Sequence, residues 1–245
     1  MRNKEQSQAW VQTVCWGQRC LPTEAASQEE FRTGDEVHIW SATVPSHFSC
    51  AGVLSAEENR AAASFVFPRD QLRYRFSHSI LRLLLSAYAC CEPASLAFGK
   101  NRFGKPFLRS ENGRSPLQFS MSHSRETVCV AIAMDRAIGL DIEYVDPVFA
   151  WPEVAEAVFS CDEQRHLAAL PQHERLSAFF RLWTQKEAWL KAEGTGLGGL
   201  GQTGRNAITA EGYQLHSFFD ENGYAGTVAV GTPVSAFRFF QYSWV

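Results

Sequence analysis

The stretch Ile138-Gly139-Leu140-Asp141-Ile142-Glu143 alternates apolar residues with glycine and acids. In an extended strand successive side chains point to opposite faces, so Gly139, Asp141 and Glu143 share one face and the apolar residues share the other. Two carboxylates on one face resist joint ionisation unless a cation or a hydrogen-bond network lies between them. Oxygen ligands favour a hard cation such as Mg²⁺, which adds waters and phosphate oxygens to its shell. The stretch therefore predicts a strand that carries either a Mg²⁺ site or, as the simpler alternative, a solvated acidic face.

Residues 173–193 are predicted to form a long helix, because apolar residues recur along them at spacings of three, four and seven. These residues are Leu176, Phe179, Phe180, Trp183 and Leu190. Glu187 and Lys191 lie one turn apart on the same side, and the simplest interpretation is an exposed ion pair worth about 0.2–0.5 kcal/mol. Together, however, the acidic strand and this helix offer three acids to one cation and lysines to a phosphate. The combination favours a metal-dependent transfer on a phosphorylated substrate.

The two segments form a pair of motifs, Gly139-x-Asp141-x-Glu143 and Trp183-x-x-Lys186-Glu187-Ala188-x-x-Lys191. This pair resembles the two signature motifs of Sfp-type phosphopantetheinyl transferases, in the subgroup with Trp and Lys-Glu-Ala. The resemblance covers roughly residues 37–235 and extends to Lys105-Pro106, Ser122-His123, Arg73 in a helix opened by Asp70, Phe159-Ser160 with Glu163, and Glu193-Gly194-Thr195-Gly196-Leu197.

The resemblance implies a reaction in which phosphopantetheine moves from coenzyme A to a serine of an acyl or peptidyl carrier protein, releasing adenosine bisphosphate. It implies that Asp141, Glu143 and Glu187 hold Mg²⁺ on the pyrophosphate, which suits phosphoryl transfer because that chemistry depends on positioning and charge neutralisation. Lys191 would neutralise the pyrophosphate and Lys186 would assist. Glu187 would also act as general base, directly or through a metal-bound water. Asp141, Glu187 and Lys191 are thus the expected catalytic residues.

Coenzyme A itself would be bound by Arg73, Lys105, Pro106, Ser122, His123, Lys186 and Lys191, according to the same resemblance. Guanidinium suits bidentate phosphate contact, whereas lysine acts as a point charge. Each assignment has a simpler alternative: a solvated surface charge for Arg73, a turn or strand entry for Lys105-Pro106, and a structural histidine for His123. The chain departs from the family at Arg60-Ala61-Ala62-Ala63, where relatives carry more basic residues, and at Ser77, where glycine is frequent.

The chain has 245 residues, 45% of them hydrophobic, and a net charge of -3. This composition predicts a globular protein and gives no broad basic surface for nucleic acid. A local basic patch at Arg165, Arg175, Arg181 and Lys191 would suit an acidic carrier protein. Seven scattered cysteines indicate neither a disulfide framework nor structural zinc. With no signal peptide and no apolar run of roughly 20 residues, we expect a cytoplasmic protein without a membrane segment, and a monomer by the resemblance.

The chain divides into a poorly ordered extension (1–35), an N-terminal half (36–136) and a C-terminal half (137–245) that contains the metal acids. Each half repeats the order strand, helices, strands. This order agrees with what the family resemblance implies, an α+β fold of two similar halves in a pseudo-twofold monomer with the active site at their interface. Gly194-Thr195-Gly196-Leu197-Gly198-Gly199 formally satisfies Gly-x-Gly-x-x-Gly. It follows a helix instead of opening one, so it is not a dinucleotide fingerprint.

Three functions remain open. The first is an active phosphopantetheinyl transferase. The second is a non-catalytic module of the same fold that binds coenzyme A or a carrier protein, which the intact acids Asp141, Glu143 and Glu187 argue against. The third is another Mg²⁺-dependent phosphotransfer or phosphoesterase enzyme, which would turn over its substrate without a protein acceptor.

Overall fold

The computed structural model describes residues 12–14, 22–49, 51–111, 113–195 and 211–243. The elements are β1 (Gln12–Val14), α1 (Pro22–Ala26), α2 (Glu29–Arg32), β2 (Glu36–Thr43), α3 (Ala56–Ala63), α4 (Pro68–Ala89), the short 3₁₀ helix η1 (Pro93–Ser95), β3 (Phe98–Lys100), β4 (Pro106–Ser110), β5 (Gly113–Arg114), β6 (Leu117–Ser124), β7 (Thr127–Met134), β8 (Ile138–Tyr144), α5 (Trp151–Val158), α6 (Cys161–Ala169), α7 (Gln172–Glu193), β9 (Tyr213–Asp220), β10 (Tyr224–Gly231) and β11 (Ala236–Gln241). In this part of the chain no helix is both long and apolar enough to cross a membrane.

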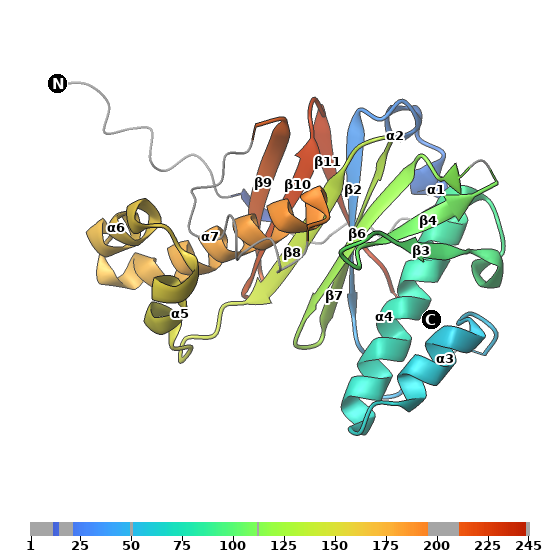
Figure 1. Cartoon of the computed structure of the whole chain (residues 1–245), viewed down its shortest axis with the longest axis horizontal. Helices are drawn as coiled ribbons and strands as arrows, with labels where there is room; N and C mark the ends of the chain where they lie inside the picture. The colour runs from blue at the N-terminus through green and yellow to red at the C-terminus, as the bar shows by residue number, and fades with distance from the viewer. Residues whose placement is uncertain (1–11, 15–21, 50, 112, 196–210, 244–245) are drawn as a thin grey trace.

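Two four-stranded sheets form the centre of the molecule (Figure 1). One has the order β11-β2-β7-β6 and belongs mainly to the N-terminal half, and the other has the order β1-β9-β10-β8 and belongs mainly to the C-terminal half. The exchange of end strands joins the halves, because β11 pairs in parallel with β2 and β1 pairs in parallel with β9. A small sheet, β3-β4-β5, lies beside them.

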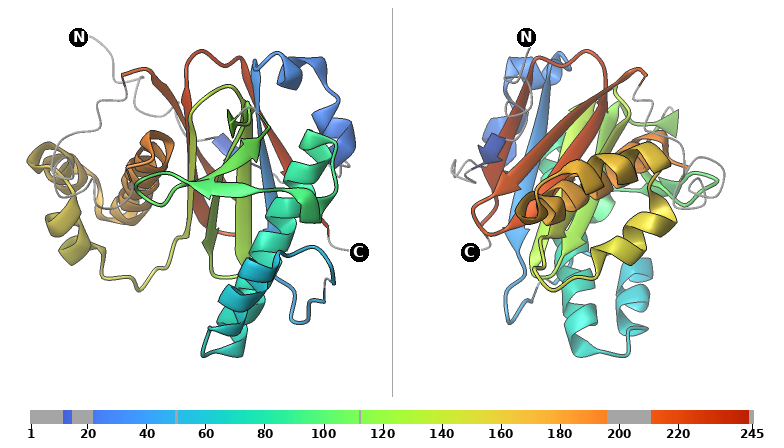
Figure 2. Two further views of the ribbon diagram at one scale, coloured as in Figure 1. Left: turned by 45° about the vertical axis from the view of Figure 1, so that its right-hand side comes forward. Right: turned by 90° about the vertical axis from the view of Figure 1, so that its left-hand side faces the viewer.

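The two sheets pack face to face, and a long helix covers each outer face. Val37, Ile39 and Ala131 from one sheet meet Leu140 and Val228 from the other in a buried apolar layer. Helix α4 covers the N-terminal sheet, while α7 contacts β8, β9 and β10 of the other sheet. Figure 2 shows from two further sides that α4 and α7 lie outside the paired sheets. The period-two alternation in the strands makes this possible, since each strand presents one apolar set inward and a second toward its helix.

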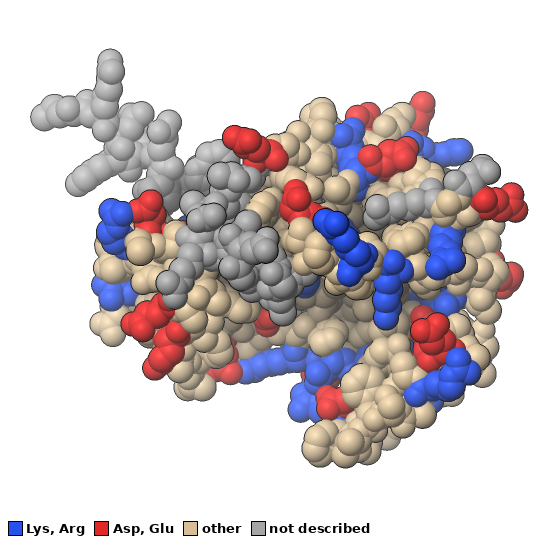
Figure 3. All heavy atoms as spheres, viewed as in Figure 1, with Lys and Arg blue, Asp and Glu red and all other residues tan. Residues whose placement is uncertain are grey.

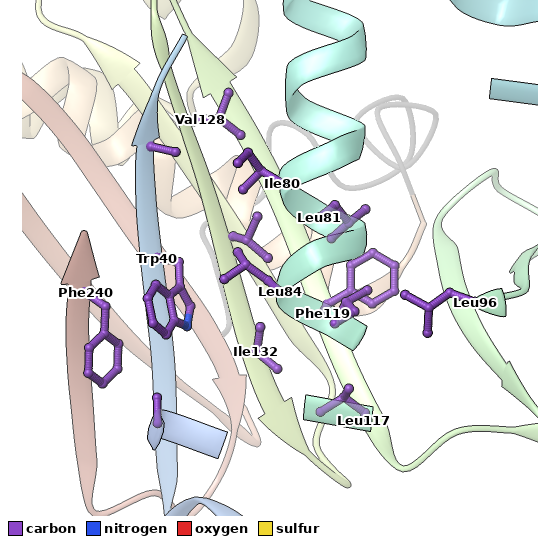
Figure 4. Packing of buried hydrophobic residues seen from close by; sticks show 14 of the residues in the cluster. Trp40, Ile80, Leu81, Leu84, Leu96, Leu117, Phe119, Val128, Ile132 and Phe240 are labelled. Carbon is purple, nitrogen blue, oxygen red and sulfur yellow. The ribbon is translucent and has the colours of Figure 1, made fainter. Parts of the chain in front are cut away.

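Helix α4 packs its apolar face against the N-terminal sheet (Figure 4). Ile80 and Leu84 point toward Val128 and Ile132, and all four side chains are almost fully buried. Trp40 stacks on Phe240 with ring centroids 4.6 Å apart, which fixes the last strand to this core. Such aromatic pairs add about 0.5–1.5 kcal/mol beyond the area that they bury. The C-terminal strand is therefore an integral part of the N-terminal half.

The two halves repeat one local device, which supports the expected pseudo-twofold fold. In the N-terminal half Ser55 and Glu58 form a capping box at the start of α3, and Glu58 pairs with Arg82 of α4 at 2.7 Å. In the C-terminal half Ser160 and Glu163 form a capping box at the start of α6, and Glu163 pairs with Lys186 of α7 at 2.8 Å. Each box satisfies the first amides of a short helix, and each buried ion pair ties that helix to the long one. The α+β prediction with two similar halves is confirmed.

The prediction of a poorly ordered extension over residues 1–35 is wrong for the part that the structure describes. Residues 22–35 include α1 and α2, and Ala25 and Phe31 are buried in the core beside α4. The ring of Phe31 lies 4.4 Å from that of His38 in β2. The sequence did not reveal this because the helices are one turn long, which is too short for an apolar periodicity. Residues 1–11 and 15–21 lie outside the described part of the chain.

Candidate active site

The candidate active site lies where an edge strand of one sheet, β6, faces an edge strand of the other, β8. β6 ends one sheet and β8 ends the other, and serines at every second position of β6 reach across to β8. Ser120 Oγ accepts a hydrogen bond from Leu140 N at 2.9 Å, and Ser124 Oγ accepts one from Tyr144 N at 3.1 Å. These bonds satisfy backbone donors along the end of the sheet, where an unpaired strand would otherwise expose them. The two halves are thereby held together along the acidic strand.

Three polar groups meet at Asp141. Its Oδ1 atom accepts hydrogen bonds from Ser122 Oγ at 2.9 Å and from Lys191 Nζ at 2.7 Å, and Lys191 Nζ also donates to Ser122 Oγ at 3.1 Å. Each half supplies part of this cluster, with Ser122 coming from β6 and the other two groups from β8 and α7. Lys191 therefore points across to β8 instead of pairing along its own helix with Glu187. This arrangement favours the functional interpretation of Lys191 over the simple surface ion pair.

The three predicted metal acids are close enough to disturb one another. Burial raises the pKa of Asp141, and burial together with the charge of Asp141 raises the pKa values of Glu143 and Glu187. Ser124 donates to Glu143 Oε2 at 2.8 Å, which partly offsets its shift. A cation between these carboxylates would lower all three pKa values, because it favours the ionised forms.

Asp141 Oδ2 is the atom that best fits a cation. It is buried and has no hydrogen-bond partner in the described structure, although a buried carboxylate oxygen normally has one. Among the described residues no group of three or more Asp, Glu, His or Cys side chains forms a ready-made metal site. Mg²⁺ commonly binds through one or two carboxylates plus waters and substrate phosphates, so a closed cage is not required. The donor set fits Mg²⁺, and the three-acid ligand set stays a prediction.

Glycine at position 139 allows α7 to lie directly on β8. A Cβ atom there would collide with the carbonyl oxygen of Ala188 and the amide nitrogen of Ala192. The rotation of α7 is fixed by a buried hydroxyl pair, in which Thr184 Oγ1 lies 2.9 Å from Thr227 Oγ1 of β10. The first glycine of the strand motif is thus needed for helix packing. This packing brings Glu187 and Lys191 over the acids.

Arg73 brings positive charge from the N-terminal half, and His123 of the same half lies near it. Arg73 lies in the second turn of α4, where its Nε atom is buried without a hydrogen-bond partner in the described structure and its Nη1 is 3.8 Å from Asp70 Oδ1. Desolvation and the charge of Arg73 lower the pKa of His123, and Lys191 and Asp141 also influence it. His123 is therefore close to both the cationic and the acidic groups. A partly buried guanidinium whose Nε has no hydrogen-bond partner among the described residues suits an anionic ligand.

Two predicted coenzyme A lysines have structural partners instead. Lys105 Nζ donates to the carbonyl oxygens of Ile138 and Ala192, at 2.9 and 3.1 Å. Lys186 is buried, pairs with Glu163 at 2.8 Å and donates to the carbonyl oxygen of Val158 at 3.1 Å. A direct phosphate contact by either ammonium would require these bonds to break. Pro106 begins β4 and is exposed.

The partners of Lys186 give a first testable prediction. Replacing Lys186 with methionine should lower the free energy of unfolding by roughly 3 kcal/mol, because it leaves the buried carboxylate of Glu163 without its cation. Activity per folded molecule should remain close to that of the unchanged protein. Urea denaturation and steady-state kinetics measure the two quantities.

The control combines Lys186→Met with Glu163→Gln. Glutamine can still close the capping box but carries no charge, so the double variant should recover much of the lost stability. A stable Lys186→Met variant that has lost coenzyme A affinity would instead assign Lys186 to the ligand.

The structure adds two serines that were not predicted and gives two arginines of the predicted basic patch other partners. Ser120 and Ser124 were not predicted, although their period-two spacing around Ser122 was visible in the sequence. In the predicted basic patch, Arg165 pairs with Asp162, and Arg175 donates to the carbonyl oxygens of Leu170 and Ala168. Figure 3 shows Lys and Arg interspersed with Asp and Glu on one face of the molecule, without a single-sign field. Gly196 and Leu197 of the predicted motif continuation lie outside the described residues.

Fold and site together define an α+β protein of two similar halves, with acids from one half facing cations from both. Comparison with known families agrees with this class. Residues 38–135 match the family described as 4'-phosphopantetheinyl transferase, N-terminal, and residues 137–222 match the 4'-phosphopantetheinyl transferase superfamily. The chain belongs to the 4'-phosphopantetheinyl transferase superfamily, and the predicted family and enzyme class are confirmed.

Individual relatives agree with this membership. The chain is 36% identical over 167 residues to the 4'-phosphopantetheinyl transferase HetI of Nostoc sp., covering 66% of this chain and 70% of the relative. It is 34% identical over 172 residues to a putative 4'-phosphopantetheinyl transferase of Synechocystis sp., covering 70% and 68%. It is 31% identical over 144 residues to the 4'-phosphopantetheinyl transferase gsp of Aneurinibacillus migulanus, covering 59% and 57%.

The coupling among the acids gives a second prediction. Replacing Asp141 with asparagine should lower the pKa of Glu187 and that of Glu143 toward the ordinary glutamate value, because the charge of Asp141 raises both. Titration of the side-chain carboxyl carbons by NMR, without added metal, measures the shift. The carboxylate of Glu174, exposed at the far end of α7, serves as internal control. Unchanged pKa values for Glu143 and Glu187 would mean that the three acids do not form one electrostatic unit.

Proposed function

We propose that this protein transfers the phosphopantetheine group of coenzyme A to a serine hydroxyl of an apo acyl or peptidyl carrier protein, with Mg²⁺ as cofactor. The serine Oγ attacks the phosphorus next to the pantetheine, and a new P–O bond forms. The bond from that phosphorus to the bridging oxygen breaks, and adenosine 3′,5′-bisphosphate leaves with that oxygen. The serine proton passes to the Glu187 carboxylate or to water. The protein acts as a monomer that holds coenzyme A and the carrier at the same time, because the serine attacks coenzyme A directly.

The environment of Asp141 is the observation that carries this proposal. One of its oxygens holds Lys191 and Ser122, and the other is buried with no partner in the described structure. Buried carboxylate oxygens usually have a hydrogen-bond partner, so this oxygen is available to a ligand. Here a fixed ammonium lies beside a carboxylate oxygen that can still accept a ligand. This pairing suits a pyrophosphate whose oxygens need both a lysine and a cation.

Each side chain has a task in the proposed reaction. Lys191 donates to the pyrophosphate and neutralises charge on the leaving group. Arg73 and His123 bind the remaining phosphate and the nucleotide. Ser122 hydrogen-bonds to both Asp141 and Lys191 and so holds the two side chains in place. Asp141, Glu143 and Glu187 would hold Mg²⁺, which supplies charge neutralisation at the phosphoryl oxygens when bound. Glu187 would accept the serine proton directly or through a metal-bound water, although Mg²⁺ on its carboxylate would lower its pKa and weaken it as a base.

Intact mass spectrometry tests the transfer directly. Two purified apo carrier proteins, one of the fatty-acid type and one of the peptide-synthetase type, are incubated with the protein, coenzyme A and Mg²⁺, with EDTA in a parallel reaction. We expect a Mg²⁺-dependent mass gain of one phosphopantetheine group, and the faster carrier indicates the natural acceptor class. Turnover of coenzyme A without carrier modification would favour a phosphoesterase. Coenzyme A binding without any turnover would favour a non-catalytic module.

A further inference from the structure

The loop between β3 and β4 touches the C-terminal end of α7, although the two belong to different halves. Lys105 Nζ donates to Ala192 O and to Ile138 O, and Asn101 Nδ2 donates to Gly194 O at 2.8 Å. Figure 1 and the left view of Figure 2 both show the β3–β4 hairpin reaching over to this end of the helix. The contact therefore joins the small sheet of the N-terminal half to the helix that carries Glu187 and Lys191.

The acceptors in this contact are backbone groups that the helix leaves open. The last carbonyls of a helix have no partner within it, and their partial negative charge favours a cation nearby. Lys105 supplies that cation and bonds at the same time to the first residue of β8. One ammonium thus ties the start of the acidic strand to the end of α7. Hydrogen bonds from a charged donor are stronger than neutral ones.

Asn101 shapes the loop that presents Lys105. Its Oδ1 atom accepts hydrogen bonds from Phe103 N and Lys105 N, each at 2.9 Å, and its backbone N donates to Lys105 O at 2.9 Å. Gly194 ends α7 with φ of 70°, and a Cβ there would lie 2.8 Å from Asn101 Nδ2. Glycine is favoured at such a helix end, and its missing side chain lets the loop approach.

The contact lies close to the catalytic cluster in the sequence of both α7 and β8. Ala192 follows Lys191 directly, and Ile138 is three residues before Asp141. We propose that Asn101 and Lys105 are positioning residues. Their contact, called the latch below, holds the end of α7 against the start of β8 and so fixes the position of the Lys191 ammonium relative to Asp141. Lys105 then acts through protein backbone and not by binding a coenzyme A phosphate. The kinetic part of this inference rests on the proposed function, whereas the structural part does not.

Hydrogen exchange in the full chain tests the structural part without any activity. Lys105→Met keeps the aliphatic stem and removes the ammonium, and Asn101→Ala removes the loop contacts. Lys105→Met should speed amide exchange in the last turn of α7, residues 190–194, by at least about 10-fold, the effect of losing one hydrogen bond to a charged group, and Asn101→Ala should speed it by a smaller factor, because its bond to Gly194 is between neutral groups. Lys100→Met is the matched control, an exposed lysine on the same hairpin, and should leave this exchange unchanged. Unchanged exchange in both test variants would overturn the latch.

A double-mutant cycle with Lys191→Ala tests the kinetic part. Lys105→Met and Asn101→Ala should each lower kcat by about 10-fold with KM for coenzyme A within about threefold, and neither should matter once Lys191 is absent, because coupled residues are not additive. The inference would be overturned if Lys105→Met raised KM for coenzyme A, Asn101→Ala had no effect, and the effect of Lys105→Met added fully to that of Lys191→Ala. Lys105 would then be a phosphate ligand. If the unchanged protein transfers nothing, the proposed function fails while the exchange result still decides the latch.

Discussion

Replacing Asp141 with asparagine should lower the rate of transfer at least about 100-fold and leave the free energy of unfolding at neutral pH unchanged or higher. The asparagine keeps the shape of the side chain and can still accept a hydrogen bond from Lys191, but it removes the charge that a cation needs. Loss of one such electrostatic contact costs about 100- to 1,000-fold in rate. Carrier modification followed by mass spectrometry measures this loss.

The stability of the same variant follows from the raised pKa of Asp141, whose main cause is burial. A carboxyl with a raised pKa binds a proton more readily in the folded protein than in the unfolded chain, so its ionised form destabilises the fold above the folded pKa. Asparagine removes that penalty, and the advantage of the variant should disappear as pH falls through the folded pKa of Asp141. Thermal melts across this pH range, in EDTA, provide the measurement. Near-normal transfer by the folded variant would contradict the role of Asp141 as a metal ligand.

Replacing Gly139 with alanine should lower both the free energy of unfolding and the rate of transfer. The added Cβ would collide with backbone atoms of Ala188 and Ala192, so α7 must move away from β8. Overpacking a buried site costs about 1–3 kcal/mol or more, and this cost is at the upper end because backbone atoms cannot change rotamer. Displacement of α7 also takes Glu187 and Lys191 away from Asp141. Urea denaturation and carrier modification measure the two losses.

Gly231→Ala is the matched control, since it also adds a Cβ to a glycine near one end of a strand in the same sheet. The nearest atoms to that Cβ belong to Ala137, at 3.8 Å or more, which is ordinary van der Waals contact. This variant should fold and transfer almost normally. A Gly139→Ala protein as stable and active as Gly231→Ala would show that α7 does not rely on the missing side chain.

Much of the local structure could be predicted from the sequence. The alternation in residues 138–143 correctly separated the face that packs between the sheets from the face that meets α7, and the apolar periodicity correctly predicted α7. The capping pattern at Ser160 and Glu163 was likewise visible as a motif. These features are local because strand alternation, helix periodicity and capping each depend on residues a few positions apart. Sequence motifs also sufficed to identify the family.

Partners distant in the chain were decided only by the tertiary structure. The family resemblance assigned coenzyme A contacts to Lys105, Lys186 and Lys191. In the structure Lys191 meets Asp141, while Lys186 pairs with Glu163 and Lys105 donates to backbone carbonyls. A lysine has a long side chain and the same charge everywhere, so its partner depends on which elements pack beside it. The sequence by itself therefore determined the strand, the helices and the family, and the packing of α7 on β8 determined which charges form the site.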